Sequence, residues 1–152
     1  YKCSADRSLA TFGGASLPRV RSYACNQKLA CPQSWDFAPD NRFRNFRKLA
    51  EVARPADIFT FIDEREDSID DGAFGVSMID TGAAARWANI PASRHNNACG
   101  VSFVDGHAEI YKWRDPITAR PAGRTQVRSY LASPHSVDIR WLQDRCTDRL
   151  GP

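Results

Sequence analysis

The sequence predicts an α+β fold in a single domain that covers residues 1–152. Three observations support this class. Short apolar runs typical of strands recur along the chain, an Asp-Gly pair separates two of them, and one amphipathic helix is indicated near the C-terminus. The apolar content of 42% is that of a folded domain and excludes a disordered chain.

The hairpin around Asp105-Gly106 is the strongest local prediction. This dipeptide is typical of a two-residue type I′ turn, because both central positions of that turn need positive φ. Such a turn fixes the register, since the side-chain period of a strand is two residues. The buried face would consist of Val101, Phe103, Ala108 and Ile110. The mixed or solvent-facing side would consist of Ser102, Val104, His107, Glu109 and Tyr111.

Weaker patterns predict the other elements. The helix over residues 136–146 would begin at Ser136 as N-cap, with a stripe of Ile139, Leu142 and Cys146. A second helix is predicted over residues 43–53, ending before Pro55. Strands are expected at 20–25, at 57–63 (central and buried on both faces) and at 73–80. Loops are expected at 5–20, 32–41, 81–94 and 114–124.

The charge distribution argues against a nucleic-acid partner. The net charge is only +3, and the basic stretch at 42–48 is matched by an acidic stretch at 63–71. Basic residues interleaved with aromatics can bind nucleic acid. A solvated basic face is the simpler interpretation of residues 42–48.

Five cysteines favour an oxidising compartment. None forms a C-x-x-C pair, which argues against a zinc ribbon. Cys25 and Cys31 bracket a short loop that a disulfide would close, and the odd count leaves one thiol over. The sequence has no apolar run of the roughly 20 residues that cross a bilayer. It begins with neither Met nor a signal peptide, so we expect an N-terminal part to lie elsewhere.

Two kinds of chemistry are suggested by residues 94–113. His95, Cys99 and His107, with Asp105 as a fourth ligand, are zinc-ligand types. Cys99 with His95 or His107 would also suit a thiolate nucleophile, but nothing in the sequence supplies an oxyanion hole. The structural alternatives are histidines bonded to the hairpin and a cysteine that fills the core or forms half of a disulfide.

A calcium site is the third hypothesis. Dense carboxylates repel one another unless solvent or a cation neutralises them. The spacing of an EF-hand is absent, and the alternative is a solvated loop paired with Arg65 or with the basic stretch. The candidate oxygens come from Asp63, Glu64, Glu66, Asp67, Asp70 and Asp71.

The stretch RHNNACGVSFVDGHAEIYKW has His95, nine intervening residues and then Asp105-Gly106. This pattern resembles the signature of the bacterial prepilin-type processing-associated H-X9-DG proteins, relatives of type II secretion pseudopilins. Flanking segments across nearly the whole chain are similar to that family as well. They are YKCSADRS, RSYACN, VARPADIFTFIDE and DIRWLQDR.

The resemblance implies the globular head of a filament subunit. Members of the family carry a basic leader and then a hydrophobic helix, which this chain lacks, so we expect a truncated head or a split subunit. Its partners would be copies of itself, other pilin-like subunits or a separate hydrophobic-helix subunit, outside the cytoplasm. His95 would brace the hairpin turn by bonding the Asp105 carboxylate or a backbone carbonyl. No catalytic residue is expected, and related pseudopilins bind calcium in a C-terminal loop.

Two other functions remain open. A secreted, adhesin-like module would recognise a surface glycan or a protein ligand, with tryptophans as a stacking platform, although core packing is their commoner use. These tryptophans are Trp35, Trp87, Trp113 and Trp141. A cysteine/histidine or metal-dependent enzyme is the third hypothesis. The assembly hypothesis predicts that Val101, Phe103 and Ile110 share an apolar sheet face buried against a helix or a partner.

Overall fold

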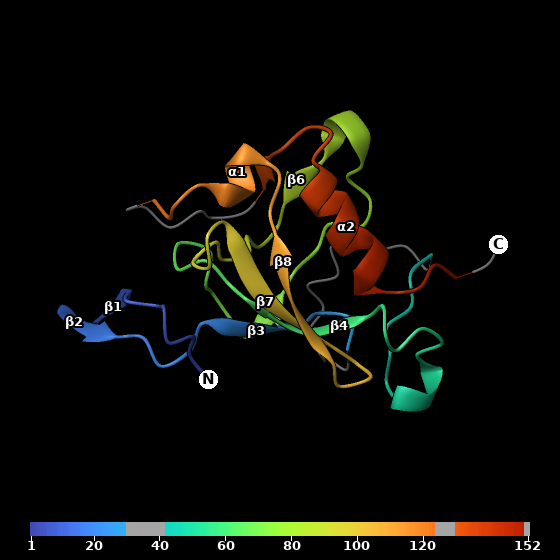
Figure 1. Cartoon of the computed structure of the whole chain (residues 1–152), viewed down its shortest axis with the longest axis horizontal. Coiled ribbons are helices and arrows are strands. Elements are labelled where there is room, and N and C mark those ends of the chain that lie inside the picture. Colours follow the sequence, from blue (N-terminus) through green and yellow to red (C-terminus); the bar gives the residue numbers. More distant parts are fainter. Residues whose placement is uncertain (30–41, 124–129, 151–152) are drawn as a thin grey trace.

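A five-stranded sheet with one helix across one of its faces forms the centre of the protein (Figure 1). The computed structural model describes residues 1–29, 42–123 and 130–150. The strand order is β5-β3-β4-β7-β8, and every neighbouring pair is antiparallel except β3 with β5. The sheet strands are β3 (Tyr23–Asn26), β4 (Phe59–Asp63), β5 (Ala73–Phe74), β7 (Ala98–Phe103) and β8 (Ala108–Lys112). The predicted α+β class is confirmed.

Smaller elements surround this sheet. A hairpin near the N-terminus projects away from the body of the molecule, and a two-stranded ribbon pairs residues before and after the sheet strands β7 and β8 (Figure 1). The hairpin consists of β1 (Leu9–Phe12) and β2 (Ala15–Pro18), and the ribbon of β6 (Arg86–Trp87) and β9 (Leu131–Ala132). The helices are η1 (Leu49–Glu51), η2 (Gly82–Ala84), α1 (Pro116–Ala119) and α2 (Val137–Cys146).

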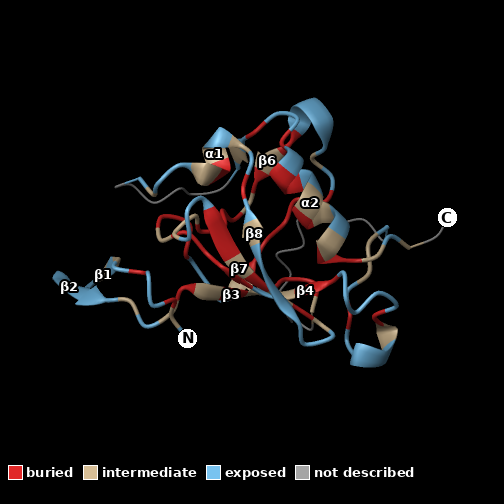
Figure 2. Ribbon diagram, in the orientation of Figure 1, coloured by how far each residue is buried: buried red, intermediate tan, exposed pale blue. Residues whose placement is uncertain are grey.

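Helix α2 covers the inner face of the sheet, as the burial pattern in Figure 2 shows. Its N-cap is Ser136, whose Oγ accepts a hydrogen bond from the Ile139 amide, as predicted. The stripe of Ile139, Leu142 and Cys146 is buried against the sheet. At the C-terminal end of the helix, the fully buried Asn26 side chain donates to the Phe59 and Cys146 carbonyls. These bonds join the helix to the two central strands.

The turn of the β7–β8 hairpin contains three residues, so the predicted two-residue turn is wrong. The Gly106 amide donates to the Phe103 carbonyl, Gly106 has φ of +94°, and Phe103 opposes His107 across the hairpin. This is the pattern of a type I turn followed by a glycine bulge. The reason for the three-residue turn lies outside the hairpin. The amides of Val104 and Asp105 donate to the carbonyls of Ile58 and Pro55, which docks the turn on the preceding segment.

The longer turn shifts the register by one residue. Val101 and Phe103 are buried as predicted, but Val101 now pairs with Glu109 rather than with Ile110. Ile110 points to the opposite face and is 65% exposed, and Ala108 is exposed with it. Tyr111, predicted to face solvent or a mixed surface, packs against the core instead.

Strand β4 contains a bulge opposite Ser102. Phe59 pairs with Phe103 and Ile62 with Val101, so two residues on β4 oppose one on β7. The Ser102 hydroxyl lies 2.7 Å from the Thr60 hydroxyl and accepts from the Phe61 amide. The strand is central, as predicted. It is not buried on both faces, because the bulge turns Phe61 outward, where 52% of it is exposed.

Other sequence predictions need correction. The helix over residues 43–53 is absent except for η1, because the Phe46 amide donates to the Lys28 carbonyl and draws this segment into an extended pairing. The strand at 73–80 stops after Phe74. The expected loop at 5–20 contains the β1–β2 hairpin, whose turn residues Gly13 and Gly14 both have positive φ. The short helix α1 was also missed.

Among the residues that the structure describes, no helix combines the length and the apolar character required to cross a bilayer.

Replacing Gly106 with alanine should lower the free energy of unfolding by about 1 kcal/mol, because a Cβ is disfavoured at positive φ. The control is Gly100→Ala in β7, where φ is not positive and the added Cβ would meet only the Ile110 Cδ1, at 4.0 Å. Urea unfolding of both variants checks this. Equal losses would show that the bulge does not require a glycine.

Candidate functional site

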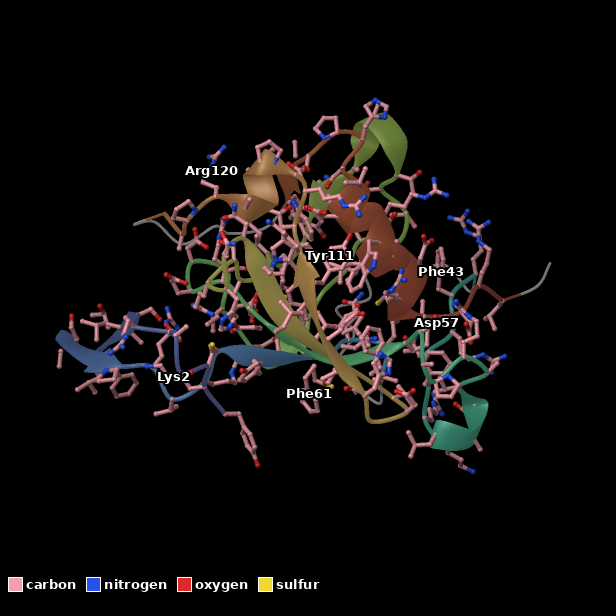
Figure 3. The ribbon with its side chains drawn as sticks, viewed as in Figure 1. Lys2, Phe43, Asp57, Phe61, Tyr111 and Arg120 are labelled. Carbon is pink, nitrogen blue, oxygen red and sulfur yellow. The ribbon has the colours of Figure 1, made fainter. Side chains whose placement is uncertain are left out.

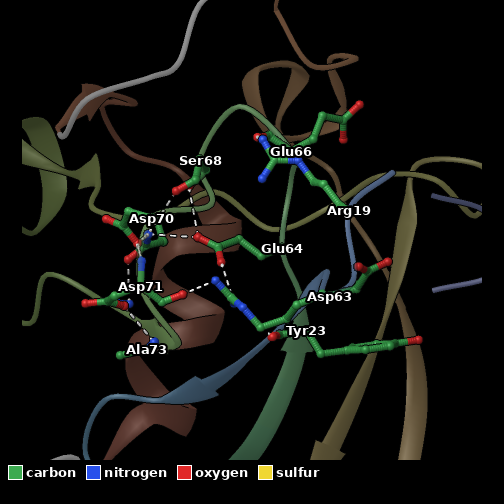
Figure 4. A network of polar contacts seen from close by, with 12 residues as sticks. Arg19, Tyr23, Asp63, Glu64, Glu66, Ser68, Asp70, Asp71 and Ala73 are labelled. Atoms are coloured by element: carbon green, nitrogen blue, oxygen red, sulfur yellow. Dashed lines mark hydrogen bonds and ion pairs between the residues drawn. The ribbon is translucent and has the colours of Figure 1, made fainter. Parts of the chain in front are cut away.

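The end of β4 and the chain that follows it carry the main concentration of charge. Here the carboxylates of the predicted calcium loop lie beside arginines (Figure 4). Arg65 grips Asp67 with two hydrogen bonds, of 2.6 and 3.2 Å. Asp70 and Asp71 accept backbone amides of their own turn. These carboxylates are thus paired with nearby arginines or backbone amides.

Glu64 is the most deeply buried of these carboxylates, with none of its surface exposed. Its Oε1 accepts from the Asn89 amide at 2.8 Å and from the Ser68 hydroxyl at 3.3 Å. Arg21 lies 3.7 Å from its Oε2. Burial and the nearby charge of Asp70 raise the pKa of Glu64 to about 8, against these favourable contacts. The side chain is therefore mainly protonated at neutral pH.

Arg94 joins three carboxylates from distant parts of the chain. It lies 2.7 Å from Asp63, 2.7 Å from Glu66 and 3.8 Å from Asp6. Burial raises the pKa of Asp63, and the guanidinium of Arg94 opposes that rise. Arg94 thus offsets the free-energy cost of burying the charged Asp63 carboxylate at the end of β4.

Beside this ion pair, three side chains of metal-binding type converge. The ligand atoms of Cys3, Asp63 and His95 all lie within 4.8 Å of one another. The Cys3 Sγ and the His95 Nε2 are 3.3 Å apart although the residues are separated by 92 positions. Cys3 and Asp63 are buried, whereas His95 is exposed.

Local structure explains how each of the three arrives there. The Cys3 amide donates to the Ser22 hydroxyl at 2.8 Å, which fixes the N-terminal segment beside the start of β3. His95 precedes Asn96 and Asn97, which both have left-handed φ, of 55° and 61°. Asparagine tolerates this conformation better than most residues. The tight turn brings His95 back over the end of β4, where Asp63 lies.

The predicted role of His95 as a brace for the hairpin turn is wrong. His95 contacts Cys3 at the opposite end of β7 from the turn. It is His107 that bonds Asp105, through Nδ1 at 2.6 Å, while its ring stacks on Phe103 with the centroids 4.3 Å apart. The hydrogen bond from His107 holds the pKa of Asp105 below its usual value.

The predicted zinc set of His95, Cys99, His107 and Asp105 is also wrong. In the described parts of the chain, Cys3, Asp63 and His95 are the one group of three or more such side chains that converges. Cys99 is fully buried in β7, and burial raises its pKa well above the ordinary value of a thiol. A nucleophile needs the opposite, a lowered pKa and an accessible sulfur atom.

The calcium prediction finds no converging set in the described residues either. Asp63 and Glu66 bond Arg94, and Asp67 bonds Arg65. Glu64 and Asp70 both accept from the Asn89 amide, so the carboxylates are occupied by protein donors. No three of the predicted calcium ligands bring their oxygens within 4.8 Å of one another. Arg65 pairs with Asp67, as the alternative allowed, but the loop is not solvated as that alternative expected, because Asp63, Glu64 and Asp67 are buried.

Two remaining predictions, the disulfide and the tryptophan platform, each involve a residue outside the described parts of the chain. Cys25 lies in β3, but Cys31 falls outside the described residues, so their disulfide stays a prediction. Trp35 falls outside them as well. Trp87 and Trp113 are buried in the core, as their commoner role requires. Trp141 stacks on Tyr111, with Arg145 lying over its ring at 4.4 Å.

A half-open groove of about 840 Å³ runs beside α2 and is separate from the cluster of Cys3, Asp63 and His95. None of these three residues lines it. Its lining includes three arginines, Arg54, Arg140 and Arg149, and one carboxylate, Asp144.

No protein-family model matches the chain, and neither a curated protein nor a solved structure matches it.

Sequence reasoning identified Asp63 and His95 but missed Cys3 and Arg94. The signal for Arg94 was its place beside His95, and that for Cys3 was its place in a segment rich in polar residues. Neither pattern reveals the distant contact. Cys3 is 92 positions from His95, and Arg94 is 31 positions from Asp63, and only the sheet brings these residues together.

Glu64 should make stability depend on pH. Its pKa in the folded state, about 8, lies above the ordinary glutamate pKa of 4.5. The folded state therefore binds more protons between these values, and the free energy of unfolding falls as pH rises from about 4.5 through 8. Glu64→Gln should flatten this slope when urea unfolding is measured across the range.

The matched control for that measurement is Glu109→Gln, which changes an exposed glutamate in β8. The control should keep the slope of the unmodified protein. A Glu64→Gln variant with the same slope would show that another group titrates.

Proposed function

We propose that this chain is the globular head of a pilin-like or pseudopilin filament subunit, which acts by self-assembly outside the cytoplasm. Two lines of support meet here. The H-X9-DG pattern formed by His95 and Asp105-Gly106 resembles that family, and the outer face of the sheet presents apolar side chains to solvent. In this proposal the protein is structural and has no catalytic residue.

The outer face is the observation that carries the proposal. The bulge in β4 places Phe61 there, and the hairpin register places Ile110 there. They are 52% and 65% exposed, and Figure 3 shows Phe61 pointing away from the body of the molecule. Large apolar side chains that are exposed together on the outer face of a sheet are what a face covered by another element would present.

A hydrophobic helix is the partner that this face fits best. The residues between Phe61 and Ile110 are small: Gly100 and Ser102 occupy β7, and Ala108 precedes Ile110 on β8. Small side chains between the larger apolar ones would let a helix lie close to the sheet. The helix would belong to a pilin-like subunit, either in the same polypeptide or in a separate hydrophobic-helix subunit.

The double variant Phe61→Ser/Ile110→Ser tests this proposal in the native cells. It should be lost from sheared surface filaments or from the membrane-anchored assembly, because the helix would lose its apolar contacts, while its Tm should change little. Leu49→Ser is the control, since Leu49 is 75% exposed on η1, outside the sheet. Normal incorporation of the double variant would contradict the proposal.

The groove beside α2 supports a second candidate, an adhesin-like module that binds an acidic surface glycan. Arg140 and Arg149 are exposed there, and their guanidinium groups suit carboxylate or sulfate groups. If this is the function, Arg140→Ala should abolish binding on an array of acidic glycans, whereas Arg7→Ala on the N-terminal segment should not. Absence of any glycan binding by the unmodified protein would remove this candidate.

A further inference from the structure

We propose that Cys3, Asp63 and His95 form a binding site for a Zn²⁺-class cation that ties the N-terminal segment to the sheet. The proposal concerns a different part of the molecule from the apolar outer face and does not depend on assembly. It rests on the geometry of three side chains, on a buried oxygen without a hydrogen bond of ordinary geometry and on the balance of charge around them.

The geometry suits a tetrahedral ion. Zinc–ligand distances of about 2.0–2.3 Å place neighbouring ligand atoms roughly 3.5 Å apart. The Cys3 Sγ and the His95 Nε2 are already 3.3 Å apart, and the Asp63 oxygen lies within 4.8 Å of both. Small rotations of these side chains would therefore complete three corners. Solvent reaches the exposed His95, so water would occupy the fourth corner.

Asp63 offers an oxygen for the ion. Its Oδ1 is held by Arg94 at 2.7 Å, whereas its buried Oδ2 has no hydrogen bond of ordinary geometry. The Cys3 thiol and the Ser22 hydroxyl lie close enough to the carboxylate to oppose the rise of its pKa. Burying an oxygen without a hydrogen bond of ordinary geometry is costly, and each instance calls for an explanation. A cation bonded to Oδ2 would provide one, with Arg94 acting as the group that orients the ligand.

The surrounding charge favours a cation. Asp6, Asp63 and Glu66 bring three carboxylates to Arg94, which supplies one positive charge. The local balance is negative even before Cys3 ionises. When the ion binds, the Cys3 thiol would release its proton to solvent, and a thiolate–metal bond would form in its place.

The ligand types select the class of metal. Thiolate and imidazole are poor ligands for calcium, which binds oxygen atoms almost exclusively. One thiolate, one imidazole and one carboxylate are a set that zinc accepts. The site therefore differs in both chemistry and membership from the calcium loop expected from the sequence, with which it shares only Asp63.

Binding of the ion would hold three segments of the chain together. The three ligands come from the N-terminal segment, from the end of β4 and from the turn before β7. Because these three segments meet only in the folded chain, an ion held by all three would bind the folded state in preference to the unfolded one and stabilise it.

Cobalt titration of the full chain, reduced and freed of metal with a chelator, tests the proposal. Co²⁺ should bind one ion per chain and give the ultraviolet absorption of a thiolate–cobalt bond, and Zn²⁺ should displace it. Zn²⁺ should also raise Tm in a concentration-dependent way, because it binds the folded state. Calcium should neither displace Co²⁺ nor raise Tm.

The variants assign the ligands. Cys3→Ser should remove the thiolate absorption. His95→Ala, at an exposed position that folding tolerates, should weaken zinc binding by more than about tenfold, the smallest loss expected even for an orienting group. Cys25→Ser and His107→Ala, outside the cluster, should bind like the unmodified protein. No cobalt absorption, or equal zinc affinity in His95→Ala and His107→Ala, would overturn the proposal.

Discussion

The docking of one turn governs much of this structure. Val104 and Asp105 donate their amides to the carbonyls of Ile58 and Pro55, and Val104 packs beside a small cluster of Phe46, Val52 and Ile58. These contacts hold three residues in the turn instead of two. Since a change of one residue exchanges the two faces of a strand, the turn decides which side chains of β8 enter the core.

The faces of the sheet follow from that constraint together with the bulge in β4. On the inner side, Tyr111 can stack on Trp141 of α2, with the ring centroids 3.8 Å apart, and the helix closes over the core. On the outer side, Phe61 and Ile110 remain in solvent. The apolar outer face is thus a by-product of satisfying the inner one, and it becomes useful if a second element covers it.

Charge imposes a different constraint at the end of β4. Asp63 ends β4, Glu64 follows it, and both side chains are buried. Neither could stay ionised there without a compensating charge or hydrogen bond. The structure uses two solutions side by side. Asp63 has an arginine at hydrogen-bonding distance and lies near a thiol and an imidazole. Glu64 is hydrogen-bonded by neutral donors, with Arg21 farther away at 3.7 Å, and has a raised pKa. Three carboxylates share the single guanidinium of Arg94 beside Asp63, and this excess of negative charge is one basis of the proposed cation site.

The sequence by itself determined the local features. Ser136 and the stripe of Ile139, Leu142 and Cys146 predicted α2, and the run ending at Asp63 predicted a central strand, because capping and periodicity depend on neighbouring residues. The pattern at residues 43–53 failed, since the backbone of Phe43 and Phe46 forms isolated bridges with Arg149 and Leu29 rather than a helical turn.

Only the tertiary structure decided the length of the hairpin turn, the exposure of Ile110 and the meeting of Cys3 with His95. Asp105-Gly106 is compatible with a turn of two residues or of three, and the choice came from hydrogen bonds to Pro55 and Ile58, some fifty positions earlier. The cluster likewise requires three segments that the sheet brings together. Contacts between distant residues leave no periodic trace in the sequence, so no local pattern could have predicted them.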